Sequence, residues 1–184
     1  MSKHFGFYKN LPVDVNEFPD QMPWISEHCM WPRDSYRQGH QGELPPFYHT
    51  GHWTDKNTQF WQLKESEIDY DFCEIKNQIP LEDHTIGMIK IDPGCTLPWH
   101  KDSFYMLRQK RQDWEEQEMI PVRYLILLED WKNGHFIQFE NTVVSQWRAG
   151  DCWFFCHETF HLGTNAGLES LISLQVSGFQ KKII

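Results

Sequence analysis

The sequence predicts a single domain over residues 1–184, with an all-β core, a sandwich or a jelly roll, behind an irregular amino-terminal segment. Three observations support this prediction. The length of 184 residues fits one domain. From about residue 84 onwards, short apolar runs alternate with turn residues, which is typical of strands of about 4–8 residues. Six of the ten prolines lie within the first 46 residues, where they would interrupt any long helix.

The first part of the chain, residues 1–83, is predicted to wrap around the core. Aromatic residues lie between its prolines, which makes the segment too apolar for a solvated tail. We therefore expect it to pack on residues 84–178, which form the core. The aromatic residues that carry this expectation are Trp24, Trp31, Phe47 and Trp53.

Six strands are expected in the core, near residues 85–91, 122–128, 135–139, 142–147, 151–156 and 170–177. Turn sequences separate them: Asp92-Pro93-Gly94, Asn133-Gly134, Ala149-Gly150-Asp151 and Asn165-Ala166-Gly167. Short strands joined by tight turns in about a hundred residues are typical of a sandwich or jelly roll. The charged stretch from Arg108 to Glu118 is predicted to be a solvated loop or short helix, with a lid over a site as the alternative.

Charge and hydropathy exclude several classes of protein. Seventeen basic residues against 26 acidic ones give a net charge of −9, which disfavours binding to nucleic acid. The longest apolar runs have five residues, so no membrane-spanning helix is expected. The amino terminus lacks the apolar region of a secretory signal, and we expect a cytoplasmic protein. No sequence feature predicts an oligomeric state.

The five cysteines do not form a recognisable metal or disulfide pattern. There is no C-x-x-C pair, and we expect them to be reduced and buried. Two of them, Cys152 and Cys156, are four residues apart, but their segment is predicted to be a strand rather than a zinc knuckle. The others are Cys29, Cys73 and Cys95.

Three residues form a candidate metal site. His100 and Asp102 are two positions apart, so in a strand or its extension both project to the same face. A distant His161 would supply a third ligand, and His157 is the alternative for that position. Two histidines and one carboxylate on one side of an ion leave open positions, as in non-haem Fe(II) oxygenases. Zinc fits the same residues.

Three motifs resemble the 2-oxoglutarate and Fe(II)-dependent oxygenases, particularly the small aspartyl/prolyl-hydroxylase-like branch found in bacteria and phages. They are P-G-x(3)-P-x-H-x-D at 93–102, V-R-Y-L-I-L-L at 122–128, and G-D-x(9)-H-x-G-x-N at 150–165. The resemblance covers about the last hundred residues. It implies a cupin-like double-stranded β-helix, with Fe(II) held by His100, Asp102 and His161. It also implies 2-oxoglutarate as cosubstrate, release of succinate and CO2, and, for a phage protein, the host cytoplasm.

The sequence departs from the family in the residue that binds the distal carboxylate of 2-oxoglutarate. The family commonly places an arginine about ten positions after the second histidine, but position 171 is Leu. Arg123 is the best substitute, because it is the one charge in an apolar strand and shares a face with Leu125 and Leu127. An arginine that simply reaches water is the alternative. Weaker candidates for binding the carboxylate are Ser173 and Tyr124.

Two further classes of function remain open. The first is a cupin-like metal enzyme that does not use 2-oxoglutarate, which the missing arginine favours. The second is a jelly-roll binding module without catalysis. For the oxygenase, the expected substrate is a peptidyl side chain or a small metabolite, recognised by residues 1–83 and by the 108–118 stretch.

Overall fold

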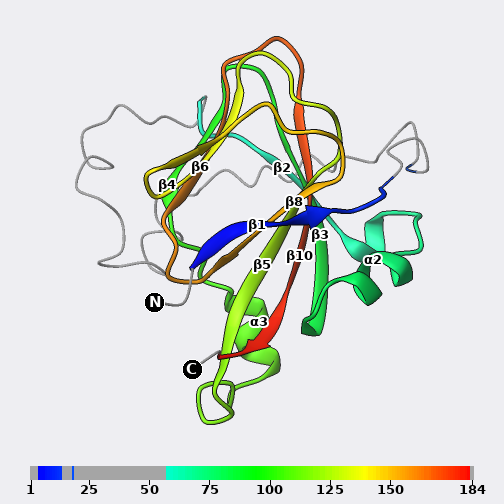
Figure 1. Ribbon diagram of the computed structural model, residues 1–184, viewed down its shortest axis with the longest axis vertical. Helices are drawn as coiled ribbons and strands as arrows, with labels where there is room; N and C mark the ends of the chain where they lie inside the picture. Colours follow the sequence, from blue (N-terminus) through cyan, green and yellow to red (C-terminus); the bar gives the residue numbers. More distant parts are fainter. Residues whose placement is uncertain (1–3, 14–17, 19–56, 183–184) are drawn as a thin grey trace.

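The computed structural model describes residues 4–13, 18 and 57–182, and its strands form two antiparallel sheets (Figure 1). The larger sheet has the order β1 (Phe5–Asn10), β8 (Asp151–Cys156), β5 (Met119–Leu127), β10 (Leu171–Lys181), β3 (Glu82–Ile91) and β2 (Trp61–Lys64). The smaller has the order β4 (Thr96–His100), β9 (His161–Asn165), β6 (His135–Phe139) and β7 (Thr142–Val144). The helices are η3 (Glu65–Glu67), α2 (Cys73–Gln78) and α3 (Tyr105–Lys110). This is the predicted all-β jelly roll.

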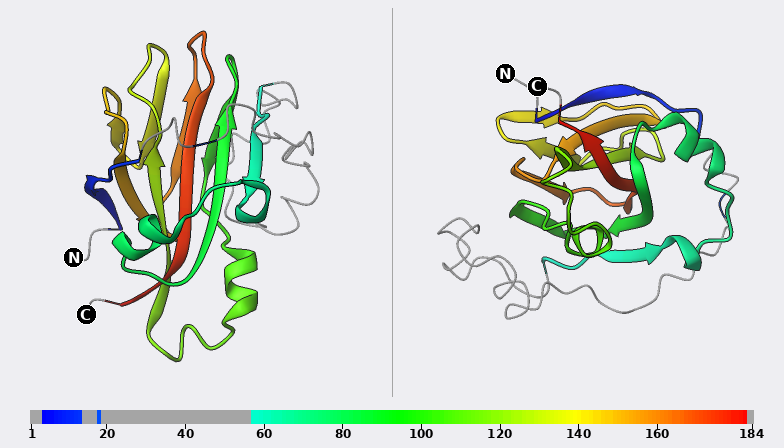
Figure 2. Two further views of the ribbon diagram at one scale, coloured as in Figure 1. Left: turned by 90° about the vertical axis from the view of Figure 1, so that its right-hand side faces the viewer. Right: turned by 90° about the horizontal axis from the view of Figure 1, so that it is seen from below.

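The alternation of side chains along the long strands divides the interior into two apolar layers. On β5, Leu125 and Leu127 face the smaller sheet and pack with Phe139 of β6. Their neighbours Tyr124 and Ile126 face the other side of the larger sheet, where α2 covers them. The period of two in a strand requires this division. Figure 2 shows β5, β10 and β3 running side by side, with α3 beside their lower ends in the left-hand view.

All six predicted core strands are present, and four further strands extend the sheets. β4 contains Pro98, and β9 contains Gly163 together with three polar residues, so neither resembles an apolar strand in sequence. β1 and β2 lie in the segment 1–83 and pair with β8 and β3. The pairing partners, which are distant in sequence, stabilise these four strands more than their own composition does.

Several smaller expectations can be compared with the structure. Gly150 occupies the predicted turn before β8 with φ +86°, and a Cβ atom there would lie 2.1 Å from the carbonyl oxygen of Leu11. The short helix expected within 108–118 is α3, which begins earlier, at Tyr105. Cys73 is exposed, so the expectation that it is buried was wrong; it lies at the start of α2.

Some expectations concern residues that lie outside the described part of the chain: Trp24, Cys29, Trp31, Phe47 and Trp53. Within the described ranges, no helix has the length and apolar character needed to cross a membrane.

Candidate metal centre

His100 and His161 are direct neighbours across the smaller sheet. His100 ends β4, His161 begins β9, and the two are register partners with ring centroids 4.1 Å apart. Each Nδ1 atom lies within hydrogen-bond distance of a backbone carbonyl: 2.6 Å to the oxygen of Pro98 for His100 and 3.1 Å to that of Thr159 for His161. A carbonyl only accepts, so both Nδ1 atoms carry the proton and both Nε2 atoms keep a lone pair.

Asp102 completes the group two residues after β4. Its Oδ1 lies 3.5 Å from Nε2 of His100 and 3.9 Å from Nε2 of His161. The three potential ligand atoms all lie within 4.8 Å of one another. Both imidazoles present their unprotonated nitrogen, and the carboxylate lies on the same side. The donor set therefore fits a divalent transition metal bound through two histidines and one carboxylate.

The Arg123 guanidinium neutralises the buried carboxylate. Its Nη1 lies 2.8 Å from Oδ2 of Asp102, and its Nε donates to Oγ of Ser177 at 3.0 Å. Its central carbon, Cζ, lies over the Phe104 ring, 5.2 Å from the ring centroid. Burial alone would raise the pKa of Asp102. The positive charge of Arg123 and the two histidines together outweigh the effect of burial and hold the pKa of Asp102 well below its usual range. Asp102 is therefore ionised at neutral pH.

His161 is neutral at the same pH. Burial, followed by the proximity of His100, lowers the pKa of His161 to about 3. An ionised carboxylate and a neutral imidazole are the states in which these groups bind metals. The protein therefore holds both in the ligating form before any metal arrives.

A cavity of about 210 Å³ lies next to the three ligands, between the two sheets. A larger hollow of about 790 Å³, bordered by α3, shares Asp102, Arg123 and Gln175 with it. The shared residues place the Asp102 carboxylate and the Arg123 guanidinium where the two spaces meet. Polar residues that line the smaller cavity are Gln62, Lys101, Ser103, Ser173 and Gln175.

The structure brings most of the predicted site residues together, but it places Tyr124 elsewhere. Arg123 and Ser173 line the cavity with the three metal ligands. Tyr124 is buried on the opposite face of the larger sheet, with Tyr8 and Phe154. Neighbouring residues of a strand face opposite ways, so Arg123 and Tyr124 cannot both reach the cavity.

His157, the alternative third ligand, is also placed elsewhere. Its ring makes an edge contact with Trp114 at 5.7 Å, and burial, with the nearby Arg108, lowers its pKa. Leu171 lines the cavity as an apolar residue, at the position where 2-oxoglutarate-dependent oxygenases commonly have arginine. Lys101 was not singled out in the sequence. Its position between the ligands His100 and Asp102 could have marked it as a residue of the site. Its ammonium nitrogen lies over the Phe160 ring, 4.7 Å from the ring centroid.

Comparison with known proteins identifies the fold. No protein-family model and no curated protein matches the chain. A prolyl-4-hydroxylase from Pseudomonas putida is 15% identical over 97% of this chain and 94% of its own, with a TM-score of 0.53. The non-haem α-ketoglutarate-dependent epimerase of nogalamycin biosynthesis is 12% identical over 83% and 71%, with a TM-score of 0.47. A cupin-like protein from Thermotoga maritima is 14% identical over 66% and 70%, with a TM-score of 0.41. The chain has the cupin-like double-stranded β-helix fold.

Proposed function

We propose that the protein is a non-haem Fe(II), 2-oxoglutarate-dependent dioxygenase that hydroxylates a C–H bond, with release of succinate and CO2. One observation carries the proposal. Nε2 of His100, Nε2 of His161 and Oδ1 of Asp102 converge beside a buried cavity, and both Nδ1 atoms donate to backbone carbonyls. An Fe(II) ion held by two histidines and one carboxylate has open positions at which a cosubstrate and dioxygen react.

The residues of the chain have separate tasks in this proposal. Arg123 pairs with Oδ2 of Asp102 and so orients the carboxylate with Oδ1 towards the metal. The guanidinium also directs Nε at Ser177, which leaves Nη2 as the donor that we assign to the distal carboxylate of 2-oxoglutarate. Ser173 lies on the same cavity wall and adds a hydroxyl donor. Lys101 supplies a second positive charge in the lining.

The larger hollow is the place that we assign to the substrate. It opens onto α3, where Tyr105 and Met106 expose most of their side chains. Exposed apolar and aromatic groups at the rim of a cavity suit a partly apolar substrate, such as a peptidyl side chain or a small metabolite. The net charge of −9 disfavours nucleic acid as the substrate.

Two observations favour a second candidate, a cupin-like metal enzyme that does not use 2-oxoglutarate. Leu171 lines the cavity without a charge, at the position where 2-oxoglutarate-dependent oxygenases commonly have an arginine that binds the cosubstrate. Arg123 already binds Asp102, so a cosubstrate carboxylate would have to share the guanidinium with a metal ligand.

An anaerobic titration separates these functions. Fe(II) and then 2-oxoglutarate are added to the protein, bound iron is quantified, and the visible charge-transfer band of the iron–2-oxoglutarate chelate is recorded. The proposal requires bound iron, the band, and formation of succinate when oxygen is admitted. Bound iron without the band would support the cupin-like enzyme that does not use 2-oxoglutarate. Absence of iron binding would support a binding module without catalysis.

Matched variants test the assignment of the ligands. His161→Ala should lose iron and band, whereas His157→Ala should keep both, because the structure places His157 against Trp114. Iron binding retained in His161→Ala would contradict the assigned triad. Arg123→Met should bind 2-oxoglutarate more weakly, with the exposed Arg148→Met as its control.

A further inference from the structure

A second group of potential metal ligands lies on the outer face of the larger sheet. Phe155 of β8 faces the smaller sheet, and its neighbour Cys156 packs with the opposite layer. Phe5 of β1 pairs with Phe155, so the preceding residue, His4, lies across from Cys156. The amide of Cys156 donates to the carbonyl of His4 at 2.9 Å, which confirms this register. The group is thus separated from the proposed iron site by the sheet itself.

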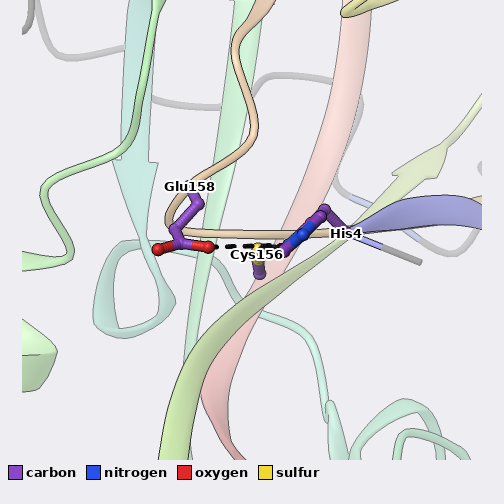
Figure 3. Close-up of side chains that lie close together, drawn as sticks. All are labelled: His4, Cys156 and Glu158. Carbon is purple, nitrogen blue, oxygen red and sulfur yellow. Dashed lines mark hydrogen bonds and ion pairs between the residues drawn. The ribbon is translucent and has the colours of Figure 1, made fainter. Parts of the chain in front are cut away.

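The ligand atoms of His4, Cys156 and Glu158 have the spacing of a zinc site (Figure 3). Nδ1 of His4 lies 3.4 Å from Sγ of Cys156 and 3.7 Å from Oε2 of Glu158, and all three atoms lie within 4.8 Å of one another. Zn²⁺ bonds of about 2.3 Å to sulfur and about 2.0–2.2 Å to nitrogen and oxygen place tetrahedral ligands about 3.3–3.6 Å apart. In Figure 3, His4 and Glu158 lie on either side of the Cys156 sulfur.

The backbone around the group is held by Thr159, which is fully buried. Its hydroxyl donates to the carbonyl of His4 at 2.8 Å, and its amide donates to the carbonyl of Cys156 at 3.1 Å. These bonds fix the two backbones that carry the nitrogen and sulfur ligands. The side chains of His4 and Glu158 are 50% and 60% exposed, so an ion can reach them from solvent, while Cys156 is 5% exposed.

We propose that His4, Cys156 and Glu158 bind one Zn²⁺ ion, with a water molecule in the fourth position. A thiolate with an imidazole and a carboxylate selects zinc over Mg²⁺ and Ca²⁺, which prefer oxygen ligands. Binding replaces the thiol proton of Cys156 by the metal, and that proton passes to the buffer. The ion joins the start of β1 to the turn after β8, whose Thr159 carbonyl also accepts from Nδ1 of His161.

Cobalt is the probe that distinguishes this site from the proposed iron site. Only a cysteine-ligated Co²⁺ ion gives a thiolate-to-cobalt charge-transfer band, and the group of His100, Asp102 and His161 contains no sulfur. Co²⁺ is titrated into the full, reduced chain without a histidine tag. We expect the sulfur band to reach its maximum when one cobalt ion per chain is bound by His4, Cys156 and Glu158. The band should disappear when Zn²⁺ is added and displaces the cobalt.

Variants identify the ligands. Cys156→Ser and His4→Gln should both lose the sulfur band. Glu158→Gln should weaken cobalt binding at this site at least tenfold. His161→Ala should keep the band, and so should Cys73→Ser, which changes an exposed cysteine elsewhere.

Three results would overturn the proposal. They are absence of the sulfur band in the unmodified protein, persistence of the band in His4→Gln, and loss of the band in Cys73→Ser. Because His4 is half exposed, His4→Gln should fold normally, so the test stands even where Cys156→Ser does not fold. The outcome is independent of iron or 2-oxoglutarate binding, since His161→Ala isolates this site.

Discussion

Replacing Arg123 by methionine should destabilise the metal-free protein by about 3 kcal/mol. The substitution keeps most of the apolar stem but removes the charge that lies 2.8 Å from Oδ2 of Asp102. The side chains of Arg123 and Asp102 are 20% and 12% exposed, so the carboxylate would be left buried without its partner. Removal of one partner of a buried ion pair costs about 3–5 kcal/mol, and the partial exposure of Arg123 places this case at the lower end.

Urea unfolding followed by tryptophan fluorescence, at pH 7 with a chelator present, measures this difference. Asp102→Asn removes the charge that Arg123 neutralises, so Arg123→Met should cost less in the Asp102→Asn background. A double-mutant cycle should give a coupling of about 2 kcal/mol. Arg148→Met, at an exposed position, is the control for loss of a positive charge.

The reasoning would be refuted by an Arg123→Met variant within about 0.5 kcal/mol of the unmodified protein, a change typical of surface substitutions. A coupling near zero between the two variants would also refute it. In that case the ion pair would not hold the buried carboxylate, and Arg123 would not be the residue that positions Asp102.

Three further predictions concern pH, the core and one turn. The folded protein holds His161 neutral down to a pKa of about 3, whereas the unfolded chain protonates it near 6.5, so stability should fall as the pH drops from 6.5 towards 3. The slope from this group is at most about 1.4 kcal/mol per pH unit, and urea unfolding of metal-free His161→Gln should show a shallower dependence. Phe139→Ala should cost about 3–5 kcal/mol in the same assay, because its ring is fully buried between the sheets; a cost below about 1 kcal/mol would contradict this packing. Gly150→Ala should be more destabilising than Gly94→Ala by at least about 1 kcal/mol in thermal unfolding. Both residues have positive φ, but only at Gly150 would a Cβ atom meet a backbone oxygen, that of Leu11; equal losses would show that the turn can move.

Local patterns allow much of the jelly roll to be predicted. The apolar strands β3, β5, β6, β8 and β10 were identifiable because their burial requires runs of apolar residues between turns. β4 and β9 were not, although they carry His100 and His161, because Pro98 and the polar residues of β9 conflict with strand propensity. Pairing between β4 and β9 forms these strands, and no local pattern reports such pairing.

The site shows the same division between local and distant information. The i, i+2 spacing grouped His100 with Asp102, and the resemblance to the oxygenase family favoured His161 over His157. The structure brings the ligand atoms of His100, Asp102 and His161 within 4.8 Å of one another. The face of Arg123 also followed from alternation along its strand. The ion pair between Arg123 and Asp102 did not, because it depends on where the loop after β4 places Asp102 relative to β5.

Local sequence patterns predicted the all-β class, six core strands and the pairing of His100 with Asp102, whereas the resemblance to the oxygenase family favoured His161 over His157 as the third ligand. The strands and the His100–Asp102 pair follow from short-range periodicity and spacing, because side chains alternate between the two faces of a strand. The tertiary structure was needed to show that His157 packs on Trp114, away from the candidate metal centre. It also decided that His4 meets Cys156 across 152 residues of chain, because strand register between distant segments is set by the packing of the whole sheet.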